Sequence, residues 1–210
     1  HDPWPFEGRP KPSVLTDPSV SSSDDCTTHF GAVDKNGNLV SCTQTAVSSF
    51  GSKVITKGLG ILWNNGMIWF NAKPGYANSI EPWKRPLVNA APLLVTKKGK
   101  PYASIGSPGG RKVNNANTNV ALNMLDFDMG PQEAITVPRV DVSGPTTQLD
   151  TRFSQLTIAK LRQLGHNVEV ISDIEAWYSF ARPSAVMVDN NRGTFRSGSD
   201  PASVPTSKGY

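Results

Sequence analysis

The 210-residue sequence predicts an α+β fold in which sheets and helices form separate layers. The first half of the chain reads as β-hairpins, and helices mixed with further strands begin only after Gly106. No segment repeats at a fixed period. With 18% charged and 37% hydrophobic residues, the composition is that of a globular protein.

The first predicted hairpin follows a leader, residues 1–25, that is rich in proline and serine and reads as a linker. The alternating pattern of Thr28–Asp34 predicts a strand. Asn36-Gly37 predicts a tight turn, and Leu39–Thr45 is the second strand of the hairpin. Every second residue from 41 to 45 carries a hydroxyl, so these hydroxyls share one face. Whether Thr27 shares that face depends on a one-residue register that stays open at this point.

Further strands are predicted at Gly58–Trp63, Pro92–Val95, Pro101–Ile105, Asn167–Ile171 and Ser184–Val188. Phe70–Pro86 reads as a long structured loop, and the tail from Ser197 to Tyr210 as irregular.

Three helices are predicted, the first directly after Gly106-Ser107-Pro108-Gly109-Gly110. Its apolar stripe is Val113, Ala116, Val120 and Met124. The second is short and begins at Pro131. The third is capped by Asp150 or Thr151 and stops at Gly165, with an apolar arc of Phe153, Leu156, Leu161 and Leu164.

Composition excludes several function classes. Net charge is +4, but lysines and arginines are scattered, so nucleic-acid binding is not indicated. Cys26, Cys42 and three dispersed histidines give no metal-ligand spacing and no disulfide framework, so we expect no metal and no cofactor. No apolar run approaches the roughly 20 residues of a membrane span. Because the chain starts without Met or a signal-peptide pattern, we expect a fragment or a processed chain.

Thr27, at the junction of leader and hairpin, is the candidate nucleophile. A hydroxyl needs a neighbouring base, and the Gly-x-Ser-x-Gly motif of serine hydrolases is absent. If the chain is cut between Cys26 and Thr27, the new α-amine of Thr27 can act as that base. The alternative is that Thr27 simply opens a strand. His29 is assigned no catalytic role.

The glycine-rich stretch before the first helix is the second candidate site. Glycines let backbone N–H groups converge at a helix N-terminus, which suits a developing oxyanion. A close-packed turn without a ligand is the alternative. Lys84-Arg85-Pro86, Asn89 and Arg111 could hold a substrate carboxylate, or be solvated surface charge.

The order of these features resembles the small subunit of the γ-glutamyltranspeptidase family, which are N-terminal-nucleophile (Ntn) hydrolases. The resemblance runs from Thr27 to Tyr210. The motifs that carry it are, in chain order, Thr27-Thr28-His29-Phe30, Val33-Asp34-Lys35-Asn36-Gly37-Asn38, Thr45, Phe50-Gly51-Ser52, Gly60-Ile61-Leu62, Asn64-Asn65, Lys84-Arg85-Pro86-Leu87, Gly106-Ser107-Pro108-Gly109-Gly110, Pro131-Gln132-Glu133-Ala134, Pro138-Arg139 and Ser199-Asp200-Pro201 through Gly209-Tyr210.

The resemblance implies a four-layer αββα sandwich completed by a large subunit that is not in this chain. It implies autocatalytic cleavage before Thr27, so that residues 1–26 end the large subunit and residues 27–210 form the catalytic small subunit. It further implies a heterodimer and a periplasmic or secreted location, with a dimer of heterodimers and a cytoplasmic location left open. Thr45 would hydrogen-bond near the nucleophile, and Gly109 and Gly110 would supply oxyanion N–H groups.

The substrate pocket departs from the family's pattern. Transpeptidases hold the glutamyl α-amine with an Asn, a Gln or Glu, and an Asp, and the matching positions here are Val47, Gly66 and Trp69. The Ser-Ser pair that helps hold the α-carboxylate is Val88-Asn89. Val, Gly and Trp cannot bind an ammonium group through charge or hydrogen bonds, so the γ-glutamyl pocket is rebuilt.

The sequence therefore predicts a self-processing amidohydrolase that forms an acyl-enzyme on Thr27, with an acyl donor other than ordinary γ-glutamyl. Three alternatives stay open: a true γ-glutamyl transferase or glutathione hydrolase, an acylase of the cephalosporin or antibiotic-pathway type, and an inactive homologue that serves as a structural subunit.

Overall fold

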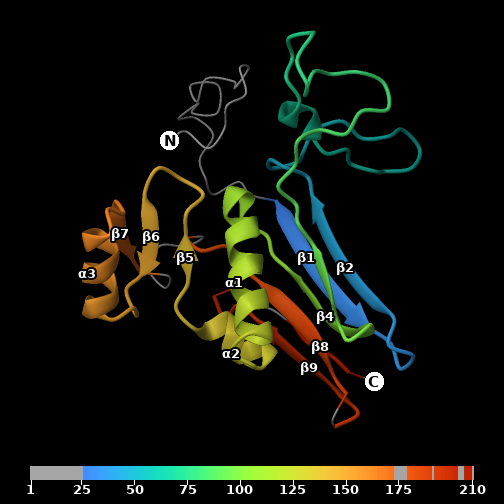
Figure 1. Ribbon diagram of the computed structural model, residues 1–210. Helices are drawn as coiled ribbons and strands as arrows, with labels where there is room; N and C mark the ends of the chain where they lie inside the picture. The colour runs from blue at the N-terminus through green and yellow to red at the C-terminus, as the bar shows by residue number, and fades with distance from the viewer. Residues whose placement is uncertain (1–25, 173–178, 191, 203–205, 210) are drawn as a thin grey trace. The chain divides into compact units, whose positions relative to one another are not determined.

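The computed structural model describes residues 26–172, 179–190, 192–202 and 206–209, and shows a mixed α/β fold (Figure 1). The described chain forms two compact units. One comprises residues 45–88 together with Cys26, and the other residues 27–44 and 89 onward. The sequence does not predict this division. Each unit is described by itself.

The larger unit begins with the predicted hairpin, in which β1 (Thr27–Val33) pairs with β2 (Leu39–Thr45), whose last residue, Thr45, belongs to the other unit. The turn closes through the N–H of Gly37 on the carbonyl of Asp34, at 3.0 Å, and Gly37 has the positive φ of 83° that such a turn needs. The carboxylate of Asp34 also accepts the backbone N–H groups of Asn36 and Asn38, both at 2.9 Å. The predicted hairpin is confirmed.

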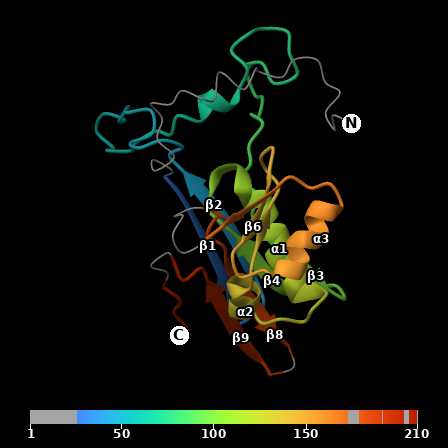
Figure 2. The ribbon, with the colours of Figure 1, turned by 90° about the vertical axis from the view of Figure 1, so that its left-hand side faces the viewer.

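The hairpin packs on one face of a four-stranded antiparallel sheet in the order β3-β4-β8-β9, and the helices lie on the other side of that sheet (Figures 1 and 2). Its strands are β3 (Leu93–Lys97), β4 (Lys100–Gly106), β8 (Ser184–Asp189) and β9 (Thr194–Ser199). The strands predicted at Pro92–Val95 and Pro101–Ile105 are confirmed and pair as a hairpin, and the strand at Ser184–Val188 is confirmed as well. The tail was predicted to be irregular from Ser197, which is wrong because β9 continues through Ser199.

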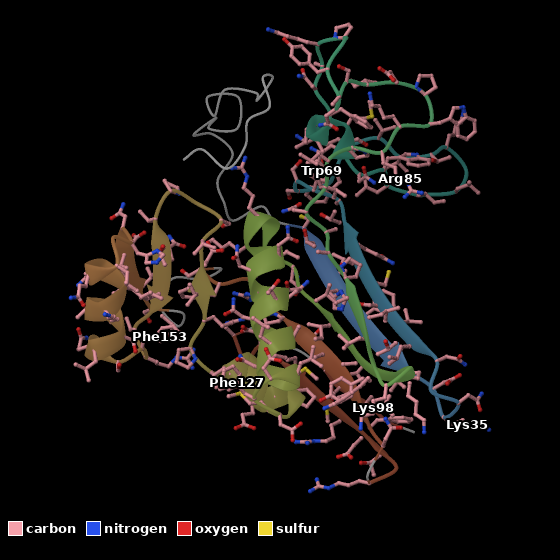
Figure 3. All side chains as sticks on the ribbon, viewed as in Figure 1. Lys35, Trp69, Arg85, Lys98, Phe127 and Phe153 are labelled. Atoms are coloured by element: carbon pink, nitrogen blue, oxygen red, sulfur yellow. The ribbon has the colours of Figure 1, made fainter. Side chains whose placement is uncertain are left out.

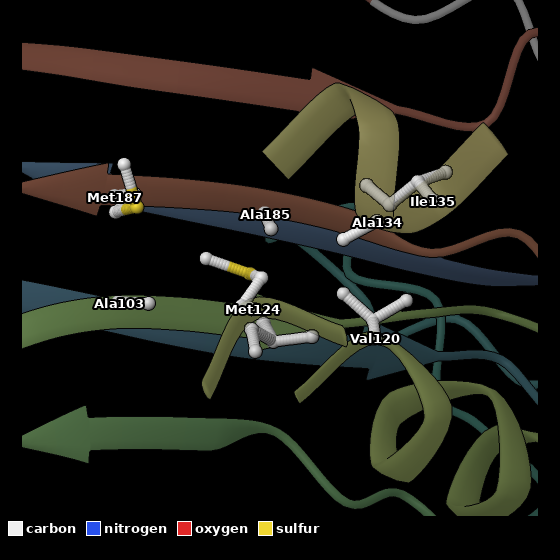
Figure 4. Packing of buried hydrophobic residues seen from close by; sticks show 8 residues of the cluster. Ala103, Val120, Met124, Ala134, Ile135, Ala185 and Met187 are labelled. Carbon is white, nitrogen blue, oxygen red and sulfur yellow. The ribbon is translucent and has the colours of Figure 1, made fainter. Parts of the chain in front are cut away.

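The faces of β4 follow the period of two that a strand imposes. Ala103 and Ile105 point into the apolar core against the helices, which Figure 4 shows together with Val120 and Met124. Ser104 points the other way, and its hydroxyl donates to the Val40 carbonyl of β2 at 2.8 Å. β4 is therefore apolar toward the helices and presents a hydroxyl toward the hairpin, while Val186 of β8 faces Gly31 of β1 on the same side.

Two helices cover the apolar face, α1 (Val113–Leu125) and α2 (Pro131–Thr136). The predicted stripe of α1 is buried as expected. The side chain of Gln132 in α2 bonds both backbone groups of Ser199, at 3.0 Å each. This contact docks the start of α2 on the end of β9.

The rest of the larger unit is a three-stranded sheet, β5 (Val140–Asp141), β6 (Thr147–Asp150) and β7 (Val168–Ile171), with α3 (Gln155–Gln163). The cap of α3 was predicted at Asp150 or Thr151 and is instead Ser154, whose hydroxyl accepts the N–H of Thr157 at 3.1 Å. The apolar arc is also partly wrong, because Ile158 is the buried residue and Leu156 is 84% exposed.

The unit of residues 45–88 contains little regular structure. A short 3₁₀ helix spans Gly66–Trp69, and isolated bridges join Ile55 to Leu62 and Asn71 to Ser79. The strand predicted at Gly58–Trp63 is wrong, since positive φ angles at Gly58 (84°) and Gly60 (67°) turn the chain there.

Candidate active site

The hairpin places the candidate nucleophile at one end of a polar face. Thr27 begins β1 and Thr45 ends β2, its paired strand. His29 Nδ1 lies 2.9 Å from Thr43 Oγ1, so the hydroxyl face of β2 is the face that carries His29. Thr27 lies two residues before His29 and therefore shares this face. The structure thereby resolves the register that the sequence leaves open.

The peptide bond between Cys26 and Thr27 has a hydrogen-bonded carbonyl. The N–H of Ala46, directly after β2, donates to the carbonyl of Cys26 at 3.3 Å. Cys26 is exposed and both described cysteines are free thiols. An N–H aimed at a carbonyl polarises it toward nucleophilic attack.

His29 connects β1 to the root of the glycine-rich loop. A Cβ added at Gly106 would lie 2.2 Å from Cε1 of His29, so the imidazole rests directly on the backbone of Gly106. Burial lowers the pKa of His29 to about 4. Nε2 is buried and has no hydrogen-bond partner among the described residues. A neutral imidazole therefore fills the space between the nucleophile strand and β4.

The loop itself is held for close backbone approach. Gly109 and Gly110 have positive φ angles of 140° and 58°, which favour glycine. The buried hydroxyl of Ser107 donates to Asn117 Oδ1 of α1 at 2.9 Å, and Asn117 donates in turn to the carbonyl of Ala91 at 2.7 Å. The loop is thus fixed to the core, while a 3₁₀ turn (Gly110–Lys112) opens α1.

The N–H groups of Gly109 and Gly110 stay available for a ligand. Neither takes part in a hydrogen bond with any residue that the structure describes. They stand just before α1, whose N-terminal end carries a partial positive charge. Two free N–H groups at such a position can stabilise an oxyanion. Thr27, Gly109 and Gly110 belong to the same compact unit.

Three of the predicted pocket residues lie together in the 45–88 unit. The segments around Val47 and Gly66 are joined by the N–H of Asn65, which donates to the Ala46 carbonyl at 3.2 Å. A Cβ at Gly66 would lie 3.1 Å from the ring of Trp69, whose position in this unit Figure 3 marks.

The backbone of this cluster is unusual at Val47. Its N–H donates to Thr45 Oγ1 at 2.8 Å, and its φ is 76°. A positive φ is strained for a β-branched residue and marks positions under functional constraint.

The other pocket candidates are divided between the units. Asn78 links Trp69 to the Val88 segment, since it donates to the Trp69 carbonyl at 2.7 Å and accepts the N–H of Leu87 at 3.0 Å. Val88 is exposed. Asn89 is half-buried and Arg111 exposed, and both belong to the larger unit.

Among the described residues no group of histidine, cysteine and acidic side chains could hold a metal ion, and no helix is both long and apolar enough to cross a membrane.

A shallow hollow lined by Lys100, Tyr102 and Arg196 lies at the opposite end of β4 from Gly106 and includes none of the candidate residues. The contact of His29 with Gly106 cannot be read from the sequence, although its spacing of two from Thr27 places His29 on the same face of β1 as Thr27.

Comparison with known proteins agrees with this geometry. The family model for gamma-glutamyltranspeptidase matches residues 8–210. The glutathione hydrolase proenzyme of Escherichia coli is 33% identical over 190 residues, which are 85% of this chain and 32% of the relative. The acylase ACY 1 proenzyme of Pseudomonas sp. strain V22 is 36% identical over 142 residues, 68% of this chain and 25% of the relative.

Solved structures extend the likeness to the fold. The gamma-glutamyltranspeptidase of Pseudomonas nitroreducens, complexed with L-DON, superposes with a TM-score of 0.69 at 30% identity, over 87% of this chain and 99% of that one. A variant of the same enzyme with tryptophan replaced by aspartate, described as highly active, superposes equally well. The cephalosporin acylase of Bacillus halodurans gives a TM-score of 0.71 at 28% identity, over 83% of this chain and 32% of that one.

The curated relatives are proenzymes, and the chain spans only about a fifth to a third of their length. They include both glutathione hydrolases and acylases. The model match over nearly all of the sequence, together with the shared fold, decides the family. The chain belongs to the gamma-glutamyltranspeptidase family of Ntn hydrolases.

Proposed function

We propose that this chain is the catalytic part of a self-processing amidohydrolase whose nucleophile is Thr27. The preceding residues, through Cys26, would end a large subunit encoded in the same precursor. The two subunits would stay together as a heterodimer. The observation that carries the proposal is that Thr27 and the glycine-rich loop lie in one unit and are linked by His29 on Gly106.

Maturation would use the same hydroxyl as catalysis. Thr27 Oγ adds to the carbonyl carbon of Cys26, the peptide C–N bond breaks, and an ester forms. Water then hydrolyses the ester, which leaves a carboxylate on Cys26 and a free amine on Thr27. The hydrogen bond from Ala46 to the Cys26 carbonyl supports this first step.

Turnover would then follow the chemistry of an N-terminal nucleophile. The α-amine of Thr27 takes the proton from Oγ as Oγ attacks the donor amide, and delivers it to the leaving nitrogen. The acyl group stays on Oγ as an ester until water, or an amine acceptor, releases it. Gly109 and Gly110 would donate to the oxyanion of both tetrahedral intermediates, where one donor contributes about 2.7–4 kcal/mol.

The donor that we propose lacks the α-ammonium group of a γ-glutamyl compound. The cluster of Val47, Gly66 and Trp69 offers no carboxylate and no side-chain amide from its three predicted positions. Burying an ammonium group against such residues leaves its charge unpaired, which is unfavourable. An acyl or dicarboxylic donor, such as a glutaryl amide, avoids that cost.

A second candidate is true γ-glutamyl transfer or hydrolysis, favoured by the glutathione hydrolases among the relatives. Trp69 is the tryptophan of this chain that we assign to the pocket. Restoring a carboxylate there therefore tests which donor the pocket takes.

The decisive experiment compares Thr27→Ala with Thr28→Ala in the full-length precursor. Thr28 is the matched control, because it is the next threonine on β1 and its side chain is exposed on the opposite face. Mass spectrometry should find a new N-terminus at Thr27 in the wild type and in Thr28→Ala, and none in Thr27→Ala. Hydrolysis of glutaryl and γ-glutamyl p-nitroanilides should vanish in Thr27→Ala alone.

Cleavage and turnover that survive in Thr27→Ala would refute this nucleophile. A wild-type precursor that never cleaves and hydrolyses neither anilide would favour an inactive structural subunit. Faster turnover of the γ-glutamyl anilide, with transfer to a dipeptide acceptor, would favour the second candidate.

A further inference from the structure

The backbone of Gly109 is supported by a residue far along the chain, Ala181. A Cβ added at Gly109 would lie 2.3 Å from Cβ and 2.6 Å from Cα of Ala181. Ala181 is only 2% exposed and has a positive φ of 60°, an unfavourable conformation for a residue with a side chain. Strain of this kind persists only where surrounding contacts enforce it.

A hydrogen bond joins the same two segments next to this contact. The N–H of Arg182 donates to the carbonyl of Pro108 at 3.0 Å. Ala181 and Arg182 therefore contact two successive residues of the loop, Pro108 and Gly109. A displacement of Ala181 and Arg182 would move the peptide groups of Gly109 and Gly110, whose N–H groups face the proposed oxyanion.

Behind Ala181 lies a buried ion pair. Arg139 Nη2 and Asp200 Oδ2 are 2.6 Å apart, and the two side chains are 2% and 3% exposed. Arg139 Nη1 donates to the carbonyl of Ala181 at 3.5 Å, and the N–H of Asp200 donates to the carbonyl of Pro183 at 2.9 Å. The ion pair thus holds the chain on both sides of Arg182.

A buried ion pair is a weak source of stability. The desolvation of two charges often cancels their attraction, and apolar replacements of similar volume are frequently neutral or better. What such a pair supplies instead is directional hydrogen bonding, which fixes the backbone groups that it contacts. In this fold Arg139 donates to the carbonyl of Ala181, and Oδ1 of Asp200 accepts the N–H of Ala202 at 2.9 Å.

We propose that Arg139, Asp200 and Ala181 form a clamp that aims the oxyanion N–H groups of the glycine-rich loop. They are positioning residues, because they act through Pro108 and Gly109 and not on the substrate. The inference rests on the proposed function for its effect on turnover. That the clamp holds the loop in place does not depend on the proposed function.

The clamp has a defined kinetic signature. A loop displaced by about 1 Å loses transition-state stabilisation and costs roughly 100-fold in rate. Donor binding in the ground state does not use the oxyanion groups in the same way, so KM should change little. A purely structural role would instead lower the amount of folded enzyme and leave kcat per active site unchanged.

The test compares Asp200→Asn with Asp150→Asn in the full-length protein. Asp150 is the matched control because it is equally buried, lies on β6 in the same unit and forms a 2.6 Å ion pair with Arg152. Its hydrogen bond to Arg139 is made by its backbone N–H, at 3.2 Å from the Arg139 carbonyl, so Asp150→Asn keeps that bond. We expect Asp200→Asn to lower kcat about 10- to 100-fold with KM within about twofold, measured on the p-nitroanilide that the wild type hydrolyses faster. Asp150→Asn should keep kcat per active site within about twofold.

A second variant guards against misfolding. Ala181→Gly removes only the methyl group against Gly109 and relieves the positive φ, so its folding should be intact. We expect its kcat to fall as well. The rate of hydrogen–deuterium exchange in the peptide covering residues 106–112 measures how firmly the loop is held. This rate should rise in Asp200→Asn and in Ala181→Gly, but not in Asp150→Asn.

The outcomes separate the two proposals. Unchanged exchange in both clamp variants would overturn the clamp, and faster exchange with unchanged kcat would overturn its role in positioning. A wild type without turnover would refute the proposed function, while the exchange measurement would still decide whether the clamp holds the loop.

Discussion

The contact between His29 and Gly106 gives the sharpest prediction. In Gly106→Ala the new Cβ would lie 2.2, 2.4 and 2.6 Å from three atoms of the imidazole. Carbon atoms in ordinary contact are about 3.5–4.0 Å apart, so the ring or the strand must move by more than about 1 Å. Overpacking of this kind costs about 1–3 kcal/mol of unfolding free energy. At roughly 2–4 °C for each kcal/mol, we expect Tm to fall by about 2–12 °C.

Thermal unfolding of four variants of the full-length protein measures this: Gly106→Ala, Gly144→Ala, His29→Ala and the double variant of His29 and Gly106. Gly144→Ala is the matched control, because a Cβ there meets nothing within 4 Å and the residue has no positive φ. Its Tm should stay within about 2 °C of the wild type. His29→Ala in the Gly106→Ala background should recover part of the loss, since it removes the ring that the new methyl group strikes. The double-mutant coupling should be about 1–2 kcal/mol.

Equal stability of Gly106→Ala and Gly144→Ala would refute the reasoning. It would mean that the imidazole does not occupy the space over Gly106, and that β1 is not tied to the glycine-rich loop there.

Two further predictions concern the same face and the pocket. Because the folded-state pKa of His29 is lowered to about 4 from about 6.5, its contribution to stability is present above pH 6.5 and is lost as the pH falls toward 4. We expect the free energy of unfolding to fall by about 1–2 kcal/mol over this range, a value discounted because the ring is only partly buried. Chemical denaturation should show this fall in the wild type and in His166→Gln, whose side chain is exposed, but not in His29→Gln. In the pocket, Trp69→Asp should raise kcat/KM for γ-glutamyl p-nitroanilide about 10- to 100-fold, since a charged hydrogen bond contributes roughly 1.5–3 kcal/mol. Trp83→Asp, at a fully exposed tryptophan of the same unit, should leave it unchanged, and equal effects of the two exchanges would contradict our assignment of Trp69 to the pocket.

Local patterns predicted the parts of the fold that depend on neighbours in sequence. The alternation around Asn36-Gly37 predicted the first hairpin, and the spacing of Val113, Ala116, Val120 and Met124 predicted α1. Both patterns work because the buried face repeats with the period of the element.

The failures arise where distant contacts decide. Gly58–Trp63 has the composition of a strand, but positive φ at its glycines turns the chain and leaves a single bridge. Leu156 fits an apolar arc, yet Ile158 is the residue that packs against the rest of the domain. Sequence spacing cannot show which side of a short helix meets its neighbour.

The candidate site divides in the same way. Thr27 and the Gly109-Gly110 pair each have a local signal, so the sequence can propose them, and their roles stay predictions. The support around them was not predicted, because Ala181 reaches Gly109 and Arg139 reaches Asp200 across long stretches of chain. Such contacts leave no periodic trace in the sequence.

The polar layer between hairpin and central sheet has a consequence for the fidelity of cleavage. A strand with an apolar inner face can slide by two residues and still bury similar groups, but hydroxyl contacts have fixed partners. Ser41 donates to the Ile105 carbonyl at 3.1 Å, Ser104 donates to the Val40 carbonyl, and the imidazole of His29 meets Thr43. The first two bonds fix the register of β2 against β4, and the contact of His29 with Thr43 fixes β1 against β2. On the proposed function, this register decides that the Cys26–Thr27 bond, and not its neighbour, stands at the start of β1 for cleavage.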